Sequence, residues 1–179
     1  MFALRRAAVI ASSLLFVSAG CAGVGKDRAQ TPSANATLRT AQGETVGTVT
    51  VRQQSDDLVF TLSAHSLPPG SHGAHVHMTG QCTPDFAAAG GHWNPDGTQH
   101  GLRNPQGSHK GDLPNVEVGA DGKGVLSFTV RNAALSGSEA SLLDADGAAF
   151  VIHAGADDMM TDPSGNSGGR IACGVFAKG

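Results

Sequence analysis

Three stretches of the chain alternate hydrophobic and polar residues with a period of two: residues 48–51, 58–62 and 126–130. Side chains two positions apart on a strand point to the same face, so each stretch is predicted to be a β-strand with one side in a core. The dipeptide Asp121-Gly122, between Val118 and Val125, predicts a hairpin turn. Short strands separated by Gly, Pro and Asp are typical of an antiparallel sandwich or barrel.

Two long stretches do not fit a strand pattern. Residues 80–112 contain seven Gly, three Pro and three His, and residues 154–169 are rich in Gly and Asp. Long loops in a compact domain are normally either functional or disordered. Something must hold the first loop in place, and its own histidines are the obvious means.

The N-terminus has the order of a secretory signal, which we assign to residues 1–20. Arg5 and Arg6 precede an apolar run over residues 7–17, and small residues follow at 18–20. The run is shorter than the roughly 20 residues that cross a bilayer. A buried N-terminal helix is the alternative, but nothing afterwards continues its pattern.

Cys21 follows the signal directly, as in bacterial lipoproteins, where this cysteine is acylated; one departure is Ser18, where that class usually has Leu. Three cysteines in an exported protein leave one unpaired, and lipidation of Cys21 would leave an even number. Simple cleavage that leaves a free thiol is the competing interpretation. Residues 21–36 are small and polar and are predicted to be a flexible tether, or a frayed end, before a domain over residues 37–179.

Composition narrows the class of protein. The 179 residues suffice for one domain, with 25 Gly, 15% charged residues and no Tyr. These values count against a coiled coil, a helical bundle or a charged disordered chain. The formal net charge is −3 and no basic cluster occurs, so we expect no nucleic-acid partner.

Histidine is the outlier, with eight residues that all lie between His65 and His153. His75 and His77 are two apart on a strand-like stretch, so their rings share a face. Imidazole suits copper and zinc, and three histidines with a carboxylate suit tetrahedral zinc. Any one histidine is more often an ordinary core or surface residue, but six with a carboxylate indicate metal. The candidates are His75, His77, His92, His100, His109, His153 and Asp112.

Several motifs around these residues occur in a specific order. They are Gly73-Ala74-His75-Val76-His77, Gly91-His92-Trp93-Asn94-Pro95, His100-Gly101, His109-Lys110-Gly111-Asp112-Leu113, His153, and Gly168-Gly169-Arg170-Ile171-Ala172-Cys173. From about residue 40 onward the chain resembles copper/zinc superoxide dismutase in its bacterial envelope form. The resemblance implies an all-β fold, a Greek-key antiparallel β-sandwich or barrel of immunoglobulin-like architecture, with two long functional loops.

The resemblance also implies a two-metal site. Copper would be bound by His75, His77, His92 and His153. Zinc would be bound by His92, His100, His109 and Asp112, with His92 as the bridge. Asp157 would link His75 to His100, and His72 would brace the site without binding metal. Cys82 and Cys173 would form a disulfide. His65 has no counterpart and is expected at the surface.

The implied activity is an antioxidant one: conversion of superoxide into oxygen and hydrogen peroxide by copper, while zinc keeps one oxidation state. His92 would hold the proton that leaves with the peroxide. Arg170 would hold the anion beside copper, although an ordinary surface charge is the plain alternative. A non-catalytic copper/zinc-binding or copper-delivery lipoprotein is the alternative function.

The expected partners are superoxide and, through the N-terminal lipid, a membrane of the bacterial cell envelope, facing the periplasm or the exterior. A homodimer is compatible with the resemblance, because both monomers and dimers occur in the family. Removal of the signal takes away Arg5 and Arg6, which leaves 10 Lys and Arg against 15 Asp and Glu, a formal charge of −5. Attraction of superoxide is therefore expected to depend on Arg170, Lys110 and Arg103.

Overall fold

The structure is a computed structural model and describes residues 31–138 and 140–179. Its regular elements are the strands β1 (Ser33–Arg39), β2 (Thr45–Gln54), β3 (Asp57–Ala64), β4 (Gly70–His72), β5 (Ala74–His77), β6 (Val116–Val118), β7 (Gly124–Val130), β8 (Ala149–His153), β9 (Arg170–Val175) and β10 (Ala177–Lys178), and the short 3-10 helix η1 (Phe86–Ala89). Within the described ranges, no helix has the length and apolar character to cross a membrane.

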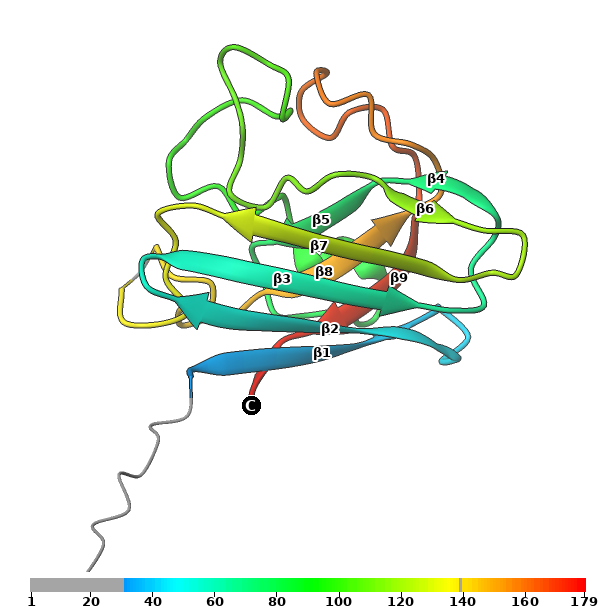
Figure 1. Ribbon diagram of the computed structural model, residues 1–179, viewed down its shortest axis with the longest axis horizontal. Coiled ribbons are helices and arrows are strands. Elements are labelled where there is room, and N and C mark those ends of the chain that lie inside the picture. The colour runs from blue at the N-terminus through cyan, green and yellow to red at the C-terminus, as the bar shows by residue number, and fades with distance from the viewer. Residues whose placement is uncertain (1–30, 139) are drawn as a thin grey trace, which may run out of the picture.

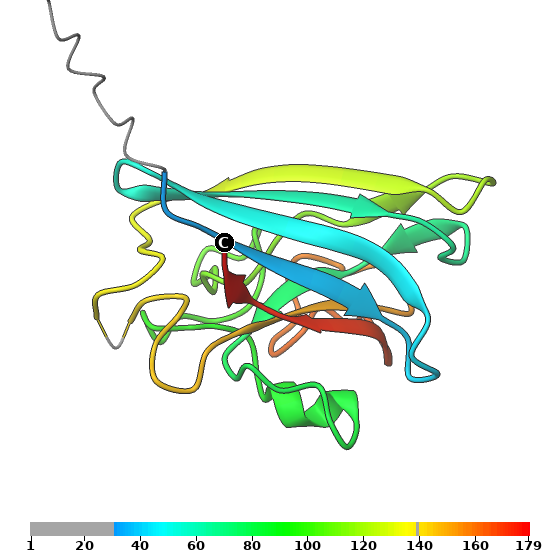
Figure 2. The same cartoon turned by 90° about the horizontal axis from the view of Figure 1, so that it is seen from below.

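The strands form one strongly curved sheet in the order β4-β6-β7-β3-β2-β1-β9-β8-β5, with β10 added to β1. Every pair is antiparallel. β1 pairs with both β2 and β9, so the first and last long strands are neighbours, and the sheet curls into a nearly closed barrel. Seen from below, the layer of β1, β2, β3 and β7 lies across from β8 and β9 (Figure 2). The predicted all-β Greek-key class is confirmed.

The stretches with alternating hydrophobic residues lie in strands that bury one side in the core, as predicted. In the β2–β3 pair, Val49 faces Leu62 and Val51 faces Phe60, and all four side chains are buried. The stretch 126–130 forms β7, in register with β3. Because each fully buried aliphatic or aromatic side chain contributes about 1.5–3 kcal/mol, these facing rows stabilise the barrel.

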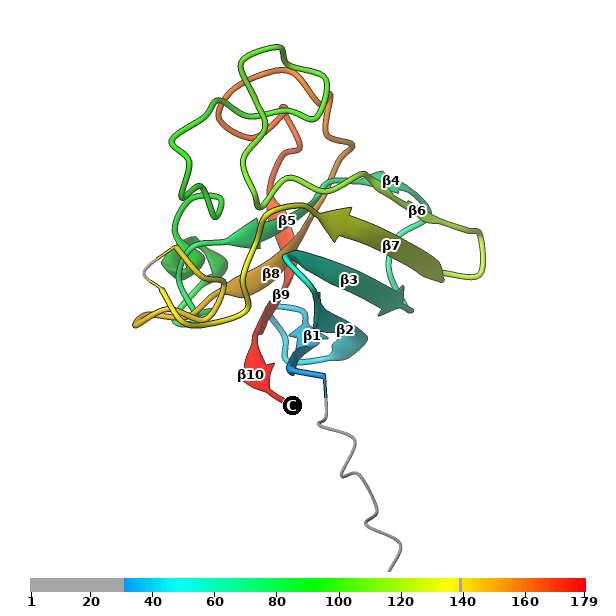
Figure 3. The ribbon, with the colours of Figure 1, turned by 60° about the vertical axis from the view of Figure 1, so that its left-hand side comes forward.

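The predicted hairpin and the two predicted loops are also present. Asp121-Gly122 lies in the turn between β6 and β7, where the Gly119 N–H donates to the Lys123 carbonyl at 2.9 Å. Apart from η1, residues 80–112 contain no helix or extended strand, and residues 154–169 contain neither. The first loop follows β5 and starts where β8 begins, whereas the second loop follows β8 and starts at the opposite end of this strand pair. Both extend to the same side of the barrel, where they lie side by side (Figures 1 and 3).

One boundary prediction is wrong. The tether was predicted to run to residue 36, but β1 begins at Ser33 and pairs with β2 from that residue. Ala34 and Ala36 are buried while Asn35 is exposed, so small residues alternate here as larger ones do elsewhere. Alanine is too weakly hydrophobic for this alternation to be noticed in the sequence. The predicted signal, residues 1–20, and the predicted lipidation site, Cys21, lie outside the described residues.

Candidate metal centre

The candidate ligands come together from two neighbouring strands and from the first of the two long loops. His75 and His77 come from β5, and His153 ends the neighbouring strand β8. The remaining candidates come from the long loop over residues 80–112. All seven are buried: His75, His77, His92, His100, His109, His153 and Asp112. Their donor atoms form two groups that share residues.

The first group consists of His75, His77, His92 and His153, whose donor atoms lie within 4.8 Å of one another. Each of the four rings has one buried nitrogen without a hydrogen-bond partner among the described residues: His75 Nδ1, His77 Nε2, His92 Nε2 and His153 Nε2. A buried polar atom left unpaired costs about 1–3 kcal/mol. Four such nitrogens in one place are the donor set that an imidazole-binding metal ion needs, so these residues fit a metal.

Carbonyl groups fix the orientation of two of these rings. His77 Nδ1 donates to the Gly90 carbonyl at 2.9 Å, and His153 Nδ1 donates to the Gly168 carbonyl at 3.0 Å. A carbonyl can only accept, so the proton lies on Nδ1 and the lone pair on Nε2 is free. Both rings are therefore prepared to coordinate through the inward nitrogen.

The second group surrounds Asp112. Its Oδ1 lies 2.8 Å from His92 Nδ1, 3.0 Å from His100 Nδ1 and 3.2 Å from His109 Nδ1. Its Oδ2 accepts the backbone N–H groups of Gly101 and His109. A tetrahedral ion with bonds of about 2.0–2.1 Å holds its donors about 3.3 Å apart. Three imidazoles and one carboxylate at these separations fit zinc.

His75 also lies within 4.8 Å of donors in His92, His100 and Asp112. Its Nε2, however, is 2.7 Å from Asp157 Oδ2, and its Nδ1 belongs to the first group. His109 Nδ1 is 3.3 Å from His92 Nδ1. His109 therefore completes the second donor set, and His75 does not.

Two side chains join the groups. His92 presents Nε2 to the first group and Nδ1 to the second. Asp157 accepts from His75 at one oxygen and, at 3.0 Å, from His100 at the other. The predicted link between the two histidines is thus present in the geometry. A change in the position or charge of one group therefore acts on the other through these two side chains.

Sequence reasoning missed two residues that hold Asp157. The Asn115 side chain donates to the Asp157 carbonyl at 2.9 Å and accepts its N–H at 2.8 Å. Gly165 adopts a φ of +62°, and a Cβ there would overlap the Asp157 carboxylate. Nothing in the local pattern distinguishes this Asn and this Gly from the many others in the loops.

The electrostatics of the two groups differ. Burial lowers the pKa of His75 to about 3, although Asp157 opposes the shift, and lowers that of His77 to about 2. Burial also lowers the pKa of His92 and of His153. Near pH 7 the first group therefore offers neutral nitrogen donors, the form that binds metal.

In the second group, hydrogen bonds to carboxylates have a larger effect on the pKa of a histidine than burial has. Burial disfavours the charged form of His100, but hydrogen bonds to Asp112 and Asp157 outweigh it and raise the pKa of His100 to about 9. The same hydrogen bonds lower the pKa of each carboxyl group despite its burial. The second group thus keeps its carboxylate ionised, and in the metal-free protein the His100 imidazolium is the cation that pairs with it. A bound metal ion would take the place of this proton.

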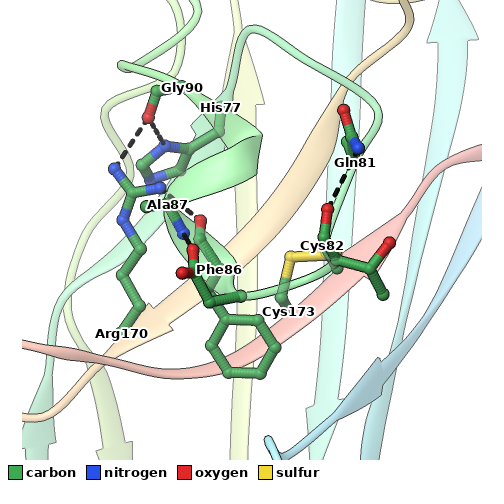
Figure 4. Close-up of a disulfide and its surroundings, with 10 residues drawn as sticks. His77, Gln81, Cys82, Phe86, Ala87, Gly90, Arg170 and Cys173 are labelled. Carbon is green, nitrogen blue, oxygen red and sulfur yellow. Dashed lines mark hydrogen bonds between the residues drawn. A yellow bond between two sulfur atoms is a disulfide. The ribbon is translucent and has the colours of Figure 1, made fainter.

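The disulfide between Cys82 and Cys173 is confirmed (Figure 4). It links the loop over residues 80–112 to β9 across a sequence separation of 91 residues. In the chain-entropy model, whose interpretation is disputed, closing such a loop contributes about 4–5 kcal/mol. The loop that carries four of the seven candidate ligands is therefore covalently fixed to the barrel.

Arg170, the first residue of β9, lies beside the first group. Its guanidinium donates to the Phe86 carbonyl at 2.5 Å and to the Gly90 carbonyl at 2.7 Å. Gly90 also accepts from His77, so one carbonyl positions both side chains (Figure 4). Partial burial lowers the pKa of Arg170, while Asp85 opposes the shift.

The other candidate cations are engaged in contacts. Lys110 Nζ lies 3.2 Å from Asp96 Oδ2 and donates to the Arg131 carbonyl at 2.9 Å. The Arg103 guanidinium donates to the Asp158 carbonyl. Because Asp96 balances the charge of Lys110, this pair contributes less to an attractive field than an isolated lysine would.

Two further histidines lie outside the donor sets. His72 is buried, with Nδ1 2.8 Å from the His153 carbonyl and Nε2 2.9 Å from the Pro68 carbonyl. It thus contacts the backbone of a candidate ligand without facing either group, as a bracing residue would. His65 is exposed, as expected.

Comparison with known proteins gives a consistent result. A sequence model of copper/zinc superoxide dismutases matches residues 45–176. The chain is 48% identical over 139 residues to the superoxide dismutase-like protein YojM of Bacillus subtilis, covering 75% of this chain and 71% of that protein. It is 40% identical over 173 residues to a copper/zinc superoxide dismutase of Aquifex aeolicus, covering 94% and 96%. The crystal structure of a superoxide dismutase-like protein from Bacillus subtilis superposes with a TM-score of 0.75 at 45% identity, over 80% of this chain and 97% of that chain.

From the lowered pKa values of the first group we expect the metal-free protein to lose stability as the pH falls. His75 and His77 have folded-state pKa values below 6.5, so below pH 6.5 the unfolded chain binds protons that the folded chain does not. The free energy of unfolding should therefore fall as pH drops from about 6.5 to 5, by up to about 1.4 kcal/mol per pH unit for each such histidine. Urea unfolding of chelator-treated protein measures this.

In that window the raised pKa of His100 adds no slope, because its contribution is fully present below pH 6.5 and is lost only toward pH 9. His77→Gln should reduce the slope, and a His65→Gln control at the surface should not. A stability that is flat or rising between pH 6.5 and 5 would contradict the prediction.

Proposed function

Because the chain belongs to the copper/zinc superoxide dismutase family, we propose that it is an enzyme that binds copper and zinc and converts superoxide into oxygen and hydrogen peroxide. The observation that carries the proposal is the set of four buried ring nitrogens beside Arg170 that find no hydrogen-bond partner in the described part of the chain. Copper would be held by His75, His77, His92 and His153, since imidazole nitrogens suit copper. Zinc would be held by His92, His100, His109 and Asp112.

Bound copper would supply the one-electron oxidation and reduction that the reaction needs. The overall conversion consumes two superoxide ions and two protons for each oxygen and hydrogen peroxide formed, so the protein must also deliver protons. His92 Nε2 is suited to hold one, because it faces the first group while Nδ1 is anchored by the second. The second group would thus keep the ring in place when Nε2 carries a proton.

Arg170 would bind the substrate anion. A guanidinium carries five N–H donors, and the Phe86 and Gly90 carbonyls each accept from it in the described structure. Donors are left for a small anion, and the charge adds electrostatic attraction. Because the formal charge of the chain without residues 1–20 is −5, from 10 Lys and Arg against 15 Asp and Glu, this local cation must overcome an overall repulsion.

A non-catalytic copper/zinc-binding or copper-delivery protein is the second candidate. It is favoured by the 48% identity to a protein named superoxide dismutase-like. The enzyme is supported more strongly, because this chain retains a complete donor set and an arginine beside it. A superoxide-consumption assay on metal-loaded protein separates the two.

The proposed place of action is the bacterial cell envelope. Residues 1–20 would be removed as a signal, and lipidated Cys21 would attach the domain to a membrane. Residues 22–32 would then connect the lipid to β1, which begins at Ser33. This arrangement leaves the metal end of the barrel open to superoxide from outside the cytoplasm.

The metal content of variants tests whether His92 binds both metals. With one equivalent each of copper and zinc, His92→Gln should lower the content of both metals, because His92 faces both groups. His153→Gln should lower copper mainly. Elemental analysis after dialysis measures this, with His65→Gln as the matched surface control. Zinc content unaffected by the loss of His92 would contradict the bridging assignment.

Substrate attraction tests the role of Arg170. Loss of a hydrogen bond to a charged group costs about 1.5–3 kcal/mol, so Arg170→Ala should lower the second-order rate constant by about 10- to 100-fold with copper retained. Exposed Arg52→Ala is the control. In the unsubstituted enzyme the rate should fall as salt rises, because screening limits the reach of this cation to about 8 Å at physiological ionic strength. Pulse radiolysis measures both, and a rate that rises with salt would show that the overall negative charge dominates.

The anchor is tested by Cys21→Ser in the full chain. The substituted protein should leave the membrane fraction while its metal content and activity stay unchanged, because every candidate ligand lies within the barrel domain whose first strand begins at Ser33. Fractionation and mass spectrometry measure this. An unmodified Cys21 in the mature unsubstituted protein would contradict lipidation.

A further inference from the structure

We propose that Asp162 is a positioning residue for zinc: a second carboxylate that orients His109, as Asp157 orients His100. The inference rests on the zinc site of the proposed function and extends it to a residue outside the donor set. It starts from a symmetry between the two ligands. His100 and His109 both turn Nδ1 toward Asp112, at 3.0 and 3.2 Å, so on each ring Nε2 remains for an outer partner.

The two outer partners come from the same loop, residues 154–169. His100 Nε2 lies 3.0 Å from Asp157 Oδ1. His109 Nε2 lies 3.9 Å from Asp162 Oδ1, within the range of an ion pair but longer than a hydrogen bond. The Asp162 side chain is 52% exposed, so it has room for the small rotation that brings a carboxylate oxygen to His109.

Asp162 is already held at this place. Its Oδ1 accepts the backbone N–H of His100 at 2.7 Å, so the carboxylate lies between the two zinc histidines. The preceding turn is fixed by Asp158, which accepts the N–H groups of Met160 and Thr161.

Contacts between the loops keep the turn against the zinc ligands. The Arg103 N–H donates to the Met159 carbonyl at 3.1 Å, and Asn104 Nδ2 donates to the Met160 carbonyl at 3.4 Å. A Cβ on Gly101 would overlap the Met159 carbonyl, so glycine permits this close approach. These contacts hold the loop that carries Asp162 against the segment that carries His100 and His109.

The chemical consequence is greater basicity of the ligand. A zinc-bound histidine that donates its second N–H to a carboxylate is fixed in tautomer and orientation and donates more strongly to the metal. Loss of such a partner typically costs 10- to 100-fold in metal affinity. His109 is the ligand that needs it, because its ring is 8% exposed while that of His100 is fully buried.

The test is a zinc titration of metal-depleted full-length protein at pH 7 against a chromophoric chelator. Asp162→Asn keeps an oxygen for the His100 N–H and removes only the charge, so the zinc dissociation constant should rise about 10-fold. Asp162→Glu keeps the charge and should stay within about threefold of the unsubstituted protein. Exposed Glu44→Gln is the control for loss of one negative charge and should have no effect.

Ring NMR of the zinc-loaded proteins separates positioning from loop collapse. The Nε2–H of His109 should exchange faster with water in Asp162→Asn, while that of His100 stays protected by Asp157. Unchanged affinity, unchanged His109 exchange, faster exchange at both histidines, or equal losses in the Asn and Glu variants would each overturn the proposal. Absence of zinc binding by the unsubstituted protein would instead contradict the proposed function.

Discussion

The burial of seven ionisable side chains in one place is the main physical constraint on the two long loops. Burial makes charge costly, so the rings of the first group stay neutral, and four of their nitrogens have no hydrogen-bond partner among the described residues. Such a cluster costs stability unless an ion takes up the lone pairs. The surrounding loops are therefore arranged to present these nitrogens and to satisfy every other polar atom of the same rings.

The division between the groups follows from where the carboxylates lie. Asp112 contacts three histidines of the second group, and Asp157 lies between the groups. Neutral nitrogen donors on one side suit a metal that changes its charge, whereas an ionised carboxylate with three imidazoles on the other suits a divalent ion of fixed charge. His92 belongs to both, so the two metals would act through one ring.

The barrel contributes rigidity rather than chemistry. Two strands, β5 and β8, supply three of the four first-group histidines at fixed register, and the disulfide attaches the loop that supplies the rest. The carbonyl of Gly90 then positions His77 and Arg170 together. The proposed substrate-binding cation and one candidate metal ligand thus depend on one residue of the loop that the disulfide holds.

Several features could be predicted from the amino-acid sequence: the strands with strong alternation, such as residues 58–62, the two long loops, and a metal site from the concentration of histidines. These features depend on local periodicity and on residue type, which a single chain displays directly. The ligand sets and the pairing of Cys82 with Cys173 came from a family resemblance rather than from spacing.

Other features became visible only in the folded chain: the start of β1 at Ser33, the hydrogen bonds between Asn115 and Asp157, the placement of Asp162 beside His100 and the ion pair of Lys110 with Asp96. Asn115 and Asp157 are 42 residues apart, and His100 and Asp162 are 62 apart. Contacts over such separations depend on how the sheet places the two loops side by side. A local pattern of hydrophobic and polar residues does not specify that placement.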